Sequence, residues 1–176
     1  FDHAATTGVK EAVLKEMLPY FNIEYGNASS IYGIGRRAKR AIEEARGKVA
    51  KVINAKPNEI YFTGCGSESD NLAIKGIARA MREKGNHIIT SKIEHHAVLN
   101  SCKSLEQEGF VVTYLNVDEK GLINLQELKD SITDKTILIT IMTANNEIGT
   151  VEPIEEIGKI AKEKNIYFHT DSVQAI

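Results

Sequence analysis

The sequence has 176 residues and a mass of 19.5 kDa, about the size of one domain. Apolar residues make up 42% and charged residues 26%, which is ordinary for a globular protein. The net charge of −2 gives no electrostatic reason to expect a nucleic acid or an anionic membrane as a partner, and no apolar run is long enough to predict a membrane-spanning helix.

Helical and extended patterns alternate along the chain. Apolar residues at helical spacing predict helices at 9–21, 35–52, 68–83, 97–108, 125–132 and 154–163. Short apolar runs predict strands at 60–63, 87–90, 111–117, 136–142 and 166–169. This alternation predicts a three-layer α/β/α fold with a mostly parallel sheet, in which the very apolar strand 136–142 is central.

Polar segments follow four of the predicted strands. In open α/β sheets the ligand lies at the carboxyl ends of the strands, so these segments are expected to form one site. They are residues 64–67, 91–96, 143–147 and 171–174.

The segment Gly64-Cys65-Gly66-Ser67 leads into a predicted helix. Its glycines allow close approach of the backbone, and the helix N-terminus and the Ser67 hydroxyl offer donors to a phosphate. The alternative is a plain helix cap in which Ser67 and Asp70 form a capping box. The spacing matches neither a Walker loop nor Gly-x-Gly-x-x-Gly, which disfavours a nucleotide.

Two cysteines exclude a disulfide scaffold and a four-cysteine zinc site. Their rarity fits the reducing cytoplasm, and no basic-then-apolar leader indicates secretion. Cys65, at a predicted helix start, has a nucleophile as one interpretation, but a turn residue is preferred. Cys102 falls on the apolar stripe of its helix and is expected in the core.

Two of the polar segments carry rings and amides. His95 can stack on a flat ligand and move a proton near neutral pH, and the alternative is a surface or helix-start histidine. Further metal ligands at a suitable spacing do not accompany it, so no metal site is predicted. Asn145 and Asn146 can donate to a ligand oxygen, and the alternative is turn chemistry.

Asp171 follows the last predicted strand. A carboxylate at a buried strand end needs a cationic partner, which a protonated pyridine nitrogen would provide. The alternatives are a helix cap or a salt bridge to lysine or arginine.

Together these segments resemble the fold-type-I pyridoxal phosphate enzymes of the class-V aminotransferase family, and within them the NifS/IscS-like cysteine desulfurases. The motif 145–149 is typical of the group that supplies sulfur for iron–sulfur clusters. The resemblance covers the whole chain and rests on residues 2–7, 26–29, 62–63, 66–71, 94–99, 145–149 and 169–174.

The resemblance implies pyridoxal 5′-phosphate as the cofactor. Gly66 and Ser67 would hold its phosphate on a helix N-terminus. His95 would stack on the pyridine ring and move protons as the catalytic residue, while Asp171 would pair with the protonated ring nitrogen.

The resemblance also assigns Asn146 and Gln174 to hydrogen bonds with the polar edge of the cofactor. The family often has threonine at the position of Ser67, which keeps the hydroxyl, and usually has glycine at the position of Cys65. Its cofactor-binding lysine, its sulfur-carrying cysteine and the arginine for the substrate carboxylate lie downstream, so this chain alone is not expected to turn over substrate.

The chain begins without methionine and ends in apolar residues past a predicted strand, so we expect a piece of a longer protein. The resemblance places residues 1–12 with the small domain or a dimer arm. Residues 13–176 would form the first part of the large cofactor-binding domain.

The activity implied is removal of sulfur from L-cysteine, giving L-alanine and an enzyme persulfide. Implied partners are a sulfur acceptor or iron–sulfur scaffold protein and a second copy of the chain, in the cytoplasm. Alternatives are a selenocysteine lyase or aminotransferase of the same fold type, and a non-catalytic interaction protein that uses this fold as a docking surface.

Overall fold

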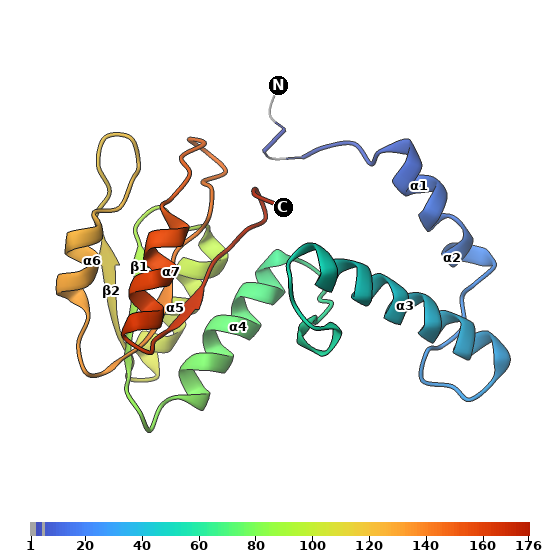
Figure 1. Cartoon of the computed structure of the whole chain (residues 1–176), viewed down its shortest axis with the longest axis horizontal. Coiled ribbons are helices and arrows are strands. Elements are labelled where there is room, and N and C mark those ends of the chain that lie inside the picture. The colour runs from blue at the N-terminus through green and yellow to red at the C-terminus, as the bar shows by residue number, and fades with distance from the viewer. Residues whose placement is uncertain (1–2, 5) are drawn as a thin grey trace. The chain divides into compact units, whose positions relative to one another are not determined.

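The computed structural model describes residues 3–4 and 6–176 of the chain (Figure 1). Asp2 and Ala5, which belong to the first motif of the resemblance, lie outside the described residues. The chain forms two compact units, Phe1–Phe62 and Thr63–Ile176. Within the described ranges, no helix combines the length and the apolar character needed to cross a membrane. The division expected after residue 12 stays a prediction.

The first unit is helical. Its elements are α1 (Glu11–Met17), α2 (Pro19–Asn22), α3 (Gly33–Val52) and a 3-10 turn, η1 (Pro57–Glu59). The single helix predicted over 9–21 is therefore two helices. The break falls at Pro19, which has no N–H to continue a helix but suits the first position of a new one.

The strand predicted at 60–63 is wrong, because these residues form no strand. The segment is held by α3 instead. Arg46 donates a hydrogen bond from its guanidinium to the carbonyl of Ile60, and the same guanidinium lies 5.0 Å from the centre of the Phe62 ring. Tyr61 and Phe62 are exposed, so the apolar run lacks the buried partners that a strand needs.

The second unit contains a sheet of four parallel strands in the order β2-β1-β3-β4. The strands are β1 (His87–Ser91), β2 (Val111–Leu115), β3 (Thr136–Thr140) and β4 (Tyr167–His169). All residues of β1 and β3 are buried, which confirms the central position expected for the apolar strand 136–142. β3 ends two residues earlier than predicted.

Helices cover both faces of this sheet. Apolar side chains of α4 (Gly66–Ala80) and α5 (His96–Gln107) pack on one face with Ile88 and Leu138. Those of α6 (Leu125–Ser131) and α7 (Ile154–Glu163) pack on the other with Ile89 and Ile139. Neighbouring strand residues thus enter opposite cores, and the expected three-layer α/β/α fold is confirmed.

The strand order creates a place for a ligand. From β1 the chain crosses to β2 on one side, and it later returns to place β3 on the other side of β1. The connections after β1 and β3 therefore diverge, leaving a crevice at their carboxyl ends, where ligands bind in open α/β sheets.

Candidate functional site

The predicted site residues after strands gather at this carboxyl edge. His95 follows β1, Asn146 follows β3 and Asp171 follows β4, all within the second unit. Backbone and side-chain bonds join the last two connections, because the Thr143 N–H donates to the Asp171 carbonyl at 2.8 Å. The Thr143 hydroxyl also lies 2.8 Å from the hydroxyls of Thr170 and Ser172.

The N-terminus of α4 supplies a further part of the site. Cys65 is its N-cap residue, so the capping box proposed for Ser67 and Asp70 is wrong. Instead, the Glu68 carboxylate accepts a 2.6 Å hydrogen bond from the Gly64 N–H. Ser67 lies in the first turn, exposed, and its hydroxyl takes part in no hydrogen bond within residues 3–4 and 6–176. The first-turn N–H groups and this hydroxyl can therefore receive an anion.

Gly66 brings the start of α4 against the connection after β4. A Cβ at this position would lie 3.0 Å from Cγ2 of Val173, tighter than ordinary van der Waals contact. The absence of a side chain at Gly66 thus lets the helix N-terminus approach the turn that carries Asp171 and Gln174.

His95 is the N-cap residue of α5 and is exposed. Its Nδ1 accepts a 3.2 Å hydrogen bond from the Ala97 N–H, so this nitrogen serves as the acceptor that caps the helix. The interpretation as a helix-start histidine is correct, and it leaves Nε2 and the ring face available to a ligand.

The two adjacent asparagines differ in their surroundings. Asn145 is buried, and its side chain serves the fold: Oδ1 accepts from the backbone N–H groups of Glu147 and Ile148, and Nδ2 donates to the Ile93 carbonyl. This is the turn chemistry given as the alternative. Asn146 is half-buried, and its side chain makes no hydrogen bond within the described ranges, so its amide is available to a ligand.

Asp171 is half-buried, and its Oδ1 accepts a 3.0 Å hydrogen bond from the Val173 N–H. In the described part of the chain, neither lysine nor arginine forms an ion pair with it, so the salt-bridge alternative is not supported. Gln174 lies in the exposed turn that follows. The carboxylate of Asp171 is suited to a cationic ligand group.

Sequence reasoning missed a pair of titratable side chains near these residues, the buried Asp70 and the half-buried His169. Asp70 of α4 lies 3.6 Å from Nε2 of His169, and Nδ1 of His169 lies 2.8 Å from the Thr140 hydroxyl. The pKa of Asp70 is raised to about 6, mainly by burial and also by the charge of Asp171, while a charge on His95 acts to lower it. Asp70 is therefore close enough to interact electrostatically with both His95 and Asp171. The first turns of α4 thus lie near the connections after β1 and β4.

Glu94 was also given no role in the sequence analysis. Its side chain is buried between the connection after β1 and the end of β3. The available signal was its position beside His95 after an apolar strand, because a carboxylate buried there is costly unless it forms hydrogen bonds.

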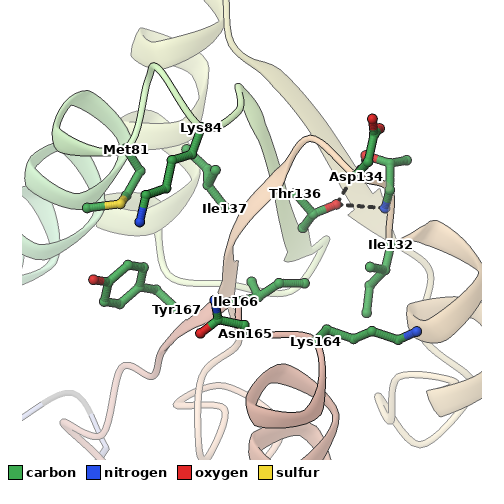
Figure 2. A pocket seen from close by; sticks show the side chains of 11 residues that line it. Met81, Lys84, Ile132, Asp134, Thr136, Ile137, Lys164, Asn165, Ile166 and Tyr167 are labelled. Atoms are coloured by element: carbon green, nitrogen blue, oxygen red, sulfur yellow. Dashed lines mark hydrogen bonds between the residues drawn. The ribbon is translucent and has the colours of Figure 1, made fainter.

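Two cavities in the described part of the second unit lie at opposite edges of the sheet. One of about 330 Å³ is lined by His95, Asn146 and their neighbours, at the candidate site. A larger one of about 650 Å³, shown in Figure 2, is lined by residues that precede or begin β3 and β4, among them Asp134, Thr136 and Tyr167. The larger cavity is therefore at the opposite edge, away from the predicted site residues.

The fold and the residues described above define an α/β protein whose candidate ligand site lies at the carboxyl ends of its parallel strands, where a helix N-terminus, a carboxylate and an imidazole ring come together. The chain belongs to the aminotransferase class-V family, because the sequence model of that family matches residues 1–176.

Curated relatives are cysteine desulfurases. The chain is 59% identical over 175 residues to cysteine desulfurase IscS of Clostridium botulinum, covering 99% of this chain and 44% of that protein. It is 61% identical to cysteine desulfurase IscS of Methanosarcina thermophila, covering 99% and 43% respectively. The chain thus spans less than half the length of these relatives.

Solved structures have the same fold. A NifS-like protein superposes with a TM-score of 0.96 at 44% identity, covering 100% of this chain and 49% of that one. The protein SspA, solved in complex with cysteine, superposes with a TM-score of 0.95 at 47% identity, covering 99% and 50%.

Proposed function

We propose that the full-length protein is a pyridoxal-phosphate-dependent cysteine desulfurase that supplies sulfur for iron–sulfur cluster assembly. The observation that carries the proposal is the convergence of His95, Asn146 and Asp171 with the N-terminus of α4 at one sheet edge. The high identity to cysteine desulfurases along the whole chain supports the choice of reaction.

The residues present fit this cofactor. Class-V aminotransferases and cysteine desulfurases are pyridoxal phosphate enzymes. The open N–H groups of α4 and the hydroxyl of Ser67 suit a phosphate, and the carboxylate of Asp171, without a cationic partner in the described ranges, suits a protonated ring nitrogen. The amides of Asn146 and Gln174 would bind its polar edge.

When bound, pyridoxal 5′-phosphate supplies an electron sink for negative charge at the α-carbon of an amino acid. Asp171 would hold the proton on the ring nitrogen and so maintain that sink. His95 would lie against the ring, and its Nε2, the nitrogen not occupied by the helix cap, is the atom at which a proton is held or moved.

The overall reaction breaks the bond between Cβ and sulfur of L-cysteine. The sulfur atom passes to a thiolate of the enzyme as a persulfide, and protons complete L-alanine. Cys102 is buried, and burial raises the pKa of its thiol to about 12, so it is unsuited to this role. Cys65 is exposed, yet we keep the expectation that the sulfur carrier is a cysteine outside this chain.

The persulfide would be passed to an acceptor or scaffold protein in the cytoplasm, and the enzyme would act as a homodimer. Exposed apolar side chains in α1 and α2 of the first unit, such as Met17 and Phe21, support a contact with a second copy.

The test uses the purified full-length protein with L-cysteine and a reductant. We expect equal amounts of alanine and sulfide and a visible absorption band from the bound cofactor. Asp171→Asn should raise the dissociation constant of pyridoxal 5′-phosphate by about 10- to 100-fold, since a charged hydrogen-bond partner is lost. Asp134→Asn, at the opposite edge of the sheet, is the control. It should change neither the dissociation constant of pyridoxal 5′-phosphate nor the amounts of alanine and sulfide.

Three outcomes would contradict the proposal. Keto acid formed without sulfur release would indicate an aminotransferase, and strong preference for selenocysteine would indicate a lyase. A protein spectrum that does not change on addition of pyridoxal 5′-phosphate would indicate a docking protein.

A further inference from the structure

We propose that Glu94 is a positioning residue of the site, because its buried carboxyl group ties the connection after β1 to the end of β3 and thereby fixes the orientation of the His95 ring. The inference rests on the proposed function only in naming the cofactor as the ligand that the ring faces.

The contacts of Glu94 reach across the crevice. Its Oε1 accepts a 2.6 Å hydrogen bond from the hydroxyl of Ser91, the last residue of β1, and a 3.1 Å bond from the N–H of Met142, just beyond β3. Glu94 and Met142 are 48 positions apart in the sequence. One oxygen thus joins the two strands between which the crevice opens.

The bond to Met142 replaces one that the sheet no longer provides. β3 ends at Thr140, and Met142 is only 2% exposed, so its N–H has no access to bulk water. Loss of the Glu94 acceptor would leave two buried donors, this N–H and the O–H of Ser91, without an acceptor, an arrangement that proteins avoid; the Ser91 oxygen would keep only the bond that it accepts from the Ile93 N–H. The connection would be expected to shift in order to satisfy them.

A second bond holds the same connection from the same side. Nδ2 of Asn145 donates to the carbonyl of Ile93 at 2.8 Å. The backbone before His95 is therefore held at two successive residues by groups that follow β3. On its other side, His95 begins α5 through the bond between its Nδ1 and the Ala97 N–H. The ring is fixed from both directions, which is what precise stacking on a flat ligand requires.

Glu94 is buried, so its side chain does not act as a solvent-exposed surface charge. The residue is 5% exposed, and its Oε2 is one of the buried atoms in the described ranges that have no hydrogen-bond partner. Burial raises the pKa of Glu94 to about 7, while the bonds from Ser91 and Met142 lower it and the charges of Asp171 and Glu152 raise it. The acceptor at Oε1 is the part that the positioning role uses, so a neutral acceptor of the same shape should serve.

The experiment compares three variants of the full-length protein. Glu94→Gln keeps an acceptor at the position of Oε1. Glu94→Leu keeps the volume of the side chain but removes that acceptor. Ser91→Ala removes one of the two donors to Oε1 and leaves the core filled. Thr136→Val is the control, because Oγ1 of Thr136 also joins separate segments, through contacts with His87 Nδ1, the Thr133 N–H and the Thr133 hydroxyl, at the opposite edge of the sheet.

The readouts are the affinity for pyridoxal 5′-phosphate and the circular dichroism of the bound cofactor in the visible region, which reports how the ring is seated. Glu94→Leu should weaken binding about tenfold and alter the dichroic band, and Ser91→Ala should do so in the same direction by less. Glu94→Gln and Thr136→Val should stay within about twofold of the unaltered protein with an unchanged band. Unchanged binding and dichroism in Glu94→Leu, or equal damage in Glu94→Gln, would overturn the inference.

A separate measurement distinguishes this inference from the proposed function. In the cofactor-free protein, the ¹⁵N resonances of the His95 imidazole should change in Glu94→Leu and stay unchanged in Glu94→Gln and Thr136→Val. If the unaltered protein fails to release sulfur from cysteine, or to bind the cofactor, these resonances still test whether the hydrogen bonds of Glu94 orient His95. If the resonances do not change in Glu94→Leu, these hydrogen bonds do not orient His95, whatever the reaction.

Discussion

His95 combines a structural and a chemical task in one side chain. Nδ1 caps α5, while Nε2 makes no hydrogen bond in the described part of the chain and the residue lines the cavity at the candidate site. Asparagine is a favoured N-cap residue with an acceptor of similar reach, but it lacks the ring. The two tasks can therefore be separated by substitution.

We predict that His95→Asn keeps the stability of the full-length protein, whereas His95→Ala loses about 1 kcal/mol because the Ala97 N–H is left without its cap. Both variants should lose cofactor affinity and activity, since both lack the ring. Urea unfolding and cofactor titration measure the two effects. Full affinity in His95→Asn would show that the imidazole is not used in binding.

At the scale of the elements, the two edges of the sheet have different polar groups. At the amino edge, His87 lies buried between the hydroxyls of Thr136 and Thr113, at 2.8 and 2.9 Å from its ring nitrogens. This network involves neutral hydroxyl partners, in contrast to the carboxylates around Asp171 at the carboxyl edge. Its chemistry is consistent with a structural role.

Burial lowers the pKa of His87, which gives stability a dependence on pH. The native state binds its proton less readily than the unfolded chain, so the contribution is present above the unfolded value of about 6.5 and is lost as pH falls through it toward the lower folded value. Asp70, whose raised pKa is about 6, acts in the opposite sense, because its buried carboxylate costs stability as pH rises.

We therefore predict that His87→Leu reduces the loss of unfolding free energy between pH 7.5 and pH 5.5 relative to the unaltered protein. Taking the difference between the two proteins removes the contribution of Asp70. Denaturant unfolding at both pH values is the measurement. A pH dependence identical in the two proteins would exclude His87 as its source.

The elements with strong local patterns were predictable. The helix at 154–163 and the strands β1 and β3 follow from apolar periodicity, because burial of one face or both dictates their residues. The prediction of a strand at 60–63 was wrong, because this apolar segment contacts Arg46 of α3 and does not join the sheet. Glu94 was missed for a related reason: its partner Met142 is distant in sequence, and no local pattern reports such a contact.

The whole molecule presents much apolar surface in its first unit. Val13, Met17, Leu18 and Phe21 are all more than 40% exposed, although α1 has apolar residues at the spacing of a packed helix. Contiguous exposed apolar side chains are typical of an interaction surface, and our proposal assigns this one to a second copy.

We predict that the full-length protein sediments as a dimer and that Phe21→Ser raises the dissociation constant of the dimer by about tenfold or more, the effect of losing a large aromatic anchor. Tyr61→Ser is the matched control, since Tyr61 is an equally exposed aromatic residue of the same unit outside α1 and α2. A monomer in analytical ultracentrifugation, or an equal effect of both substitutions, would be inconsistent with this assignment.

The close approach of Gly66 to Val173 has a consequence for biosynthesis. The two residues lie near the first and last positions of the second unit, so the anion site and the turn with Asp171 meet only after nearly all of that unit has been translated. A ribosome-bound chain that stops before the turn would hold α4 and the central strands but not a complete pocket. On the proposed function, the N-terminus of α4 and the Asp171 carboxylate can therefore hold the cofactor together only once β4 has joined the sheet.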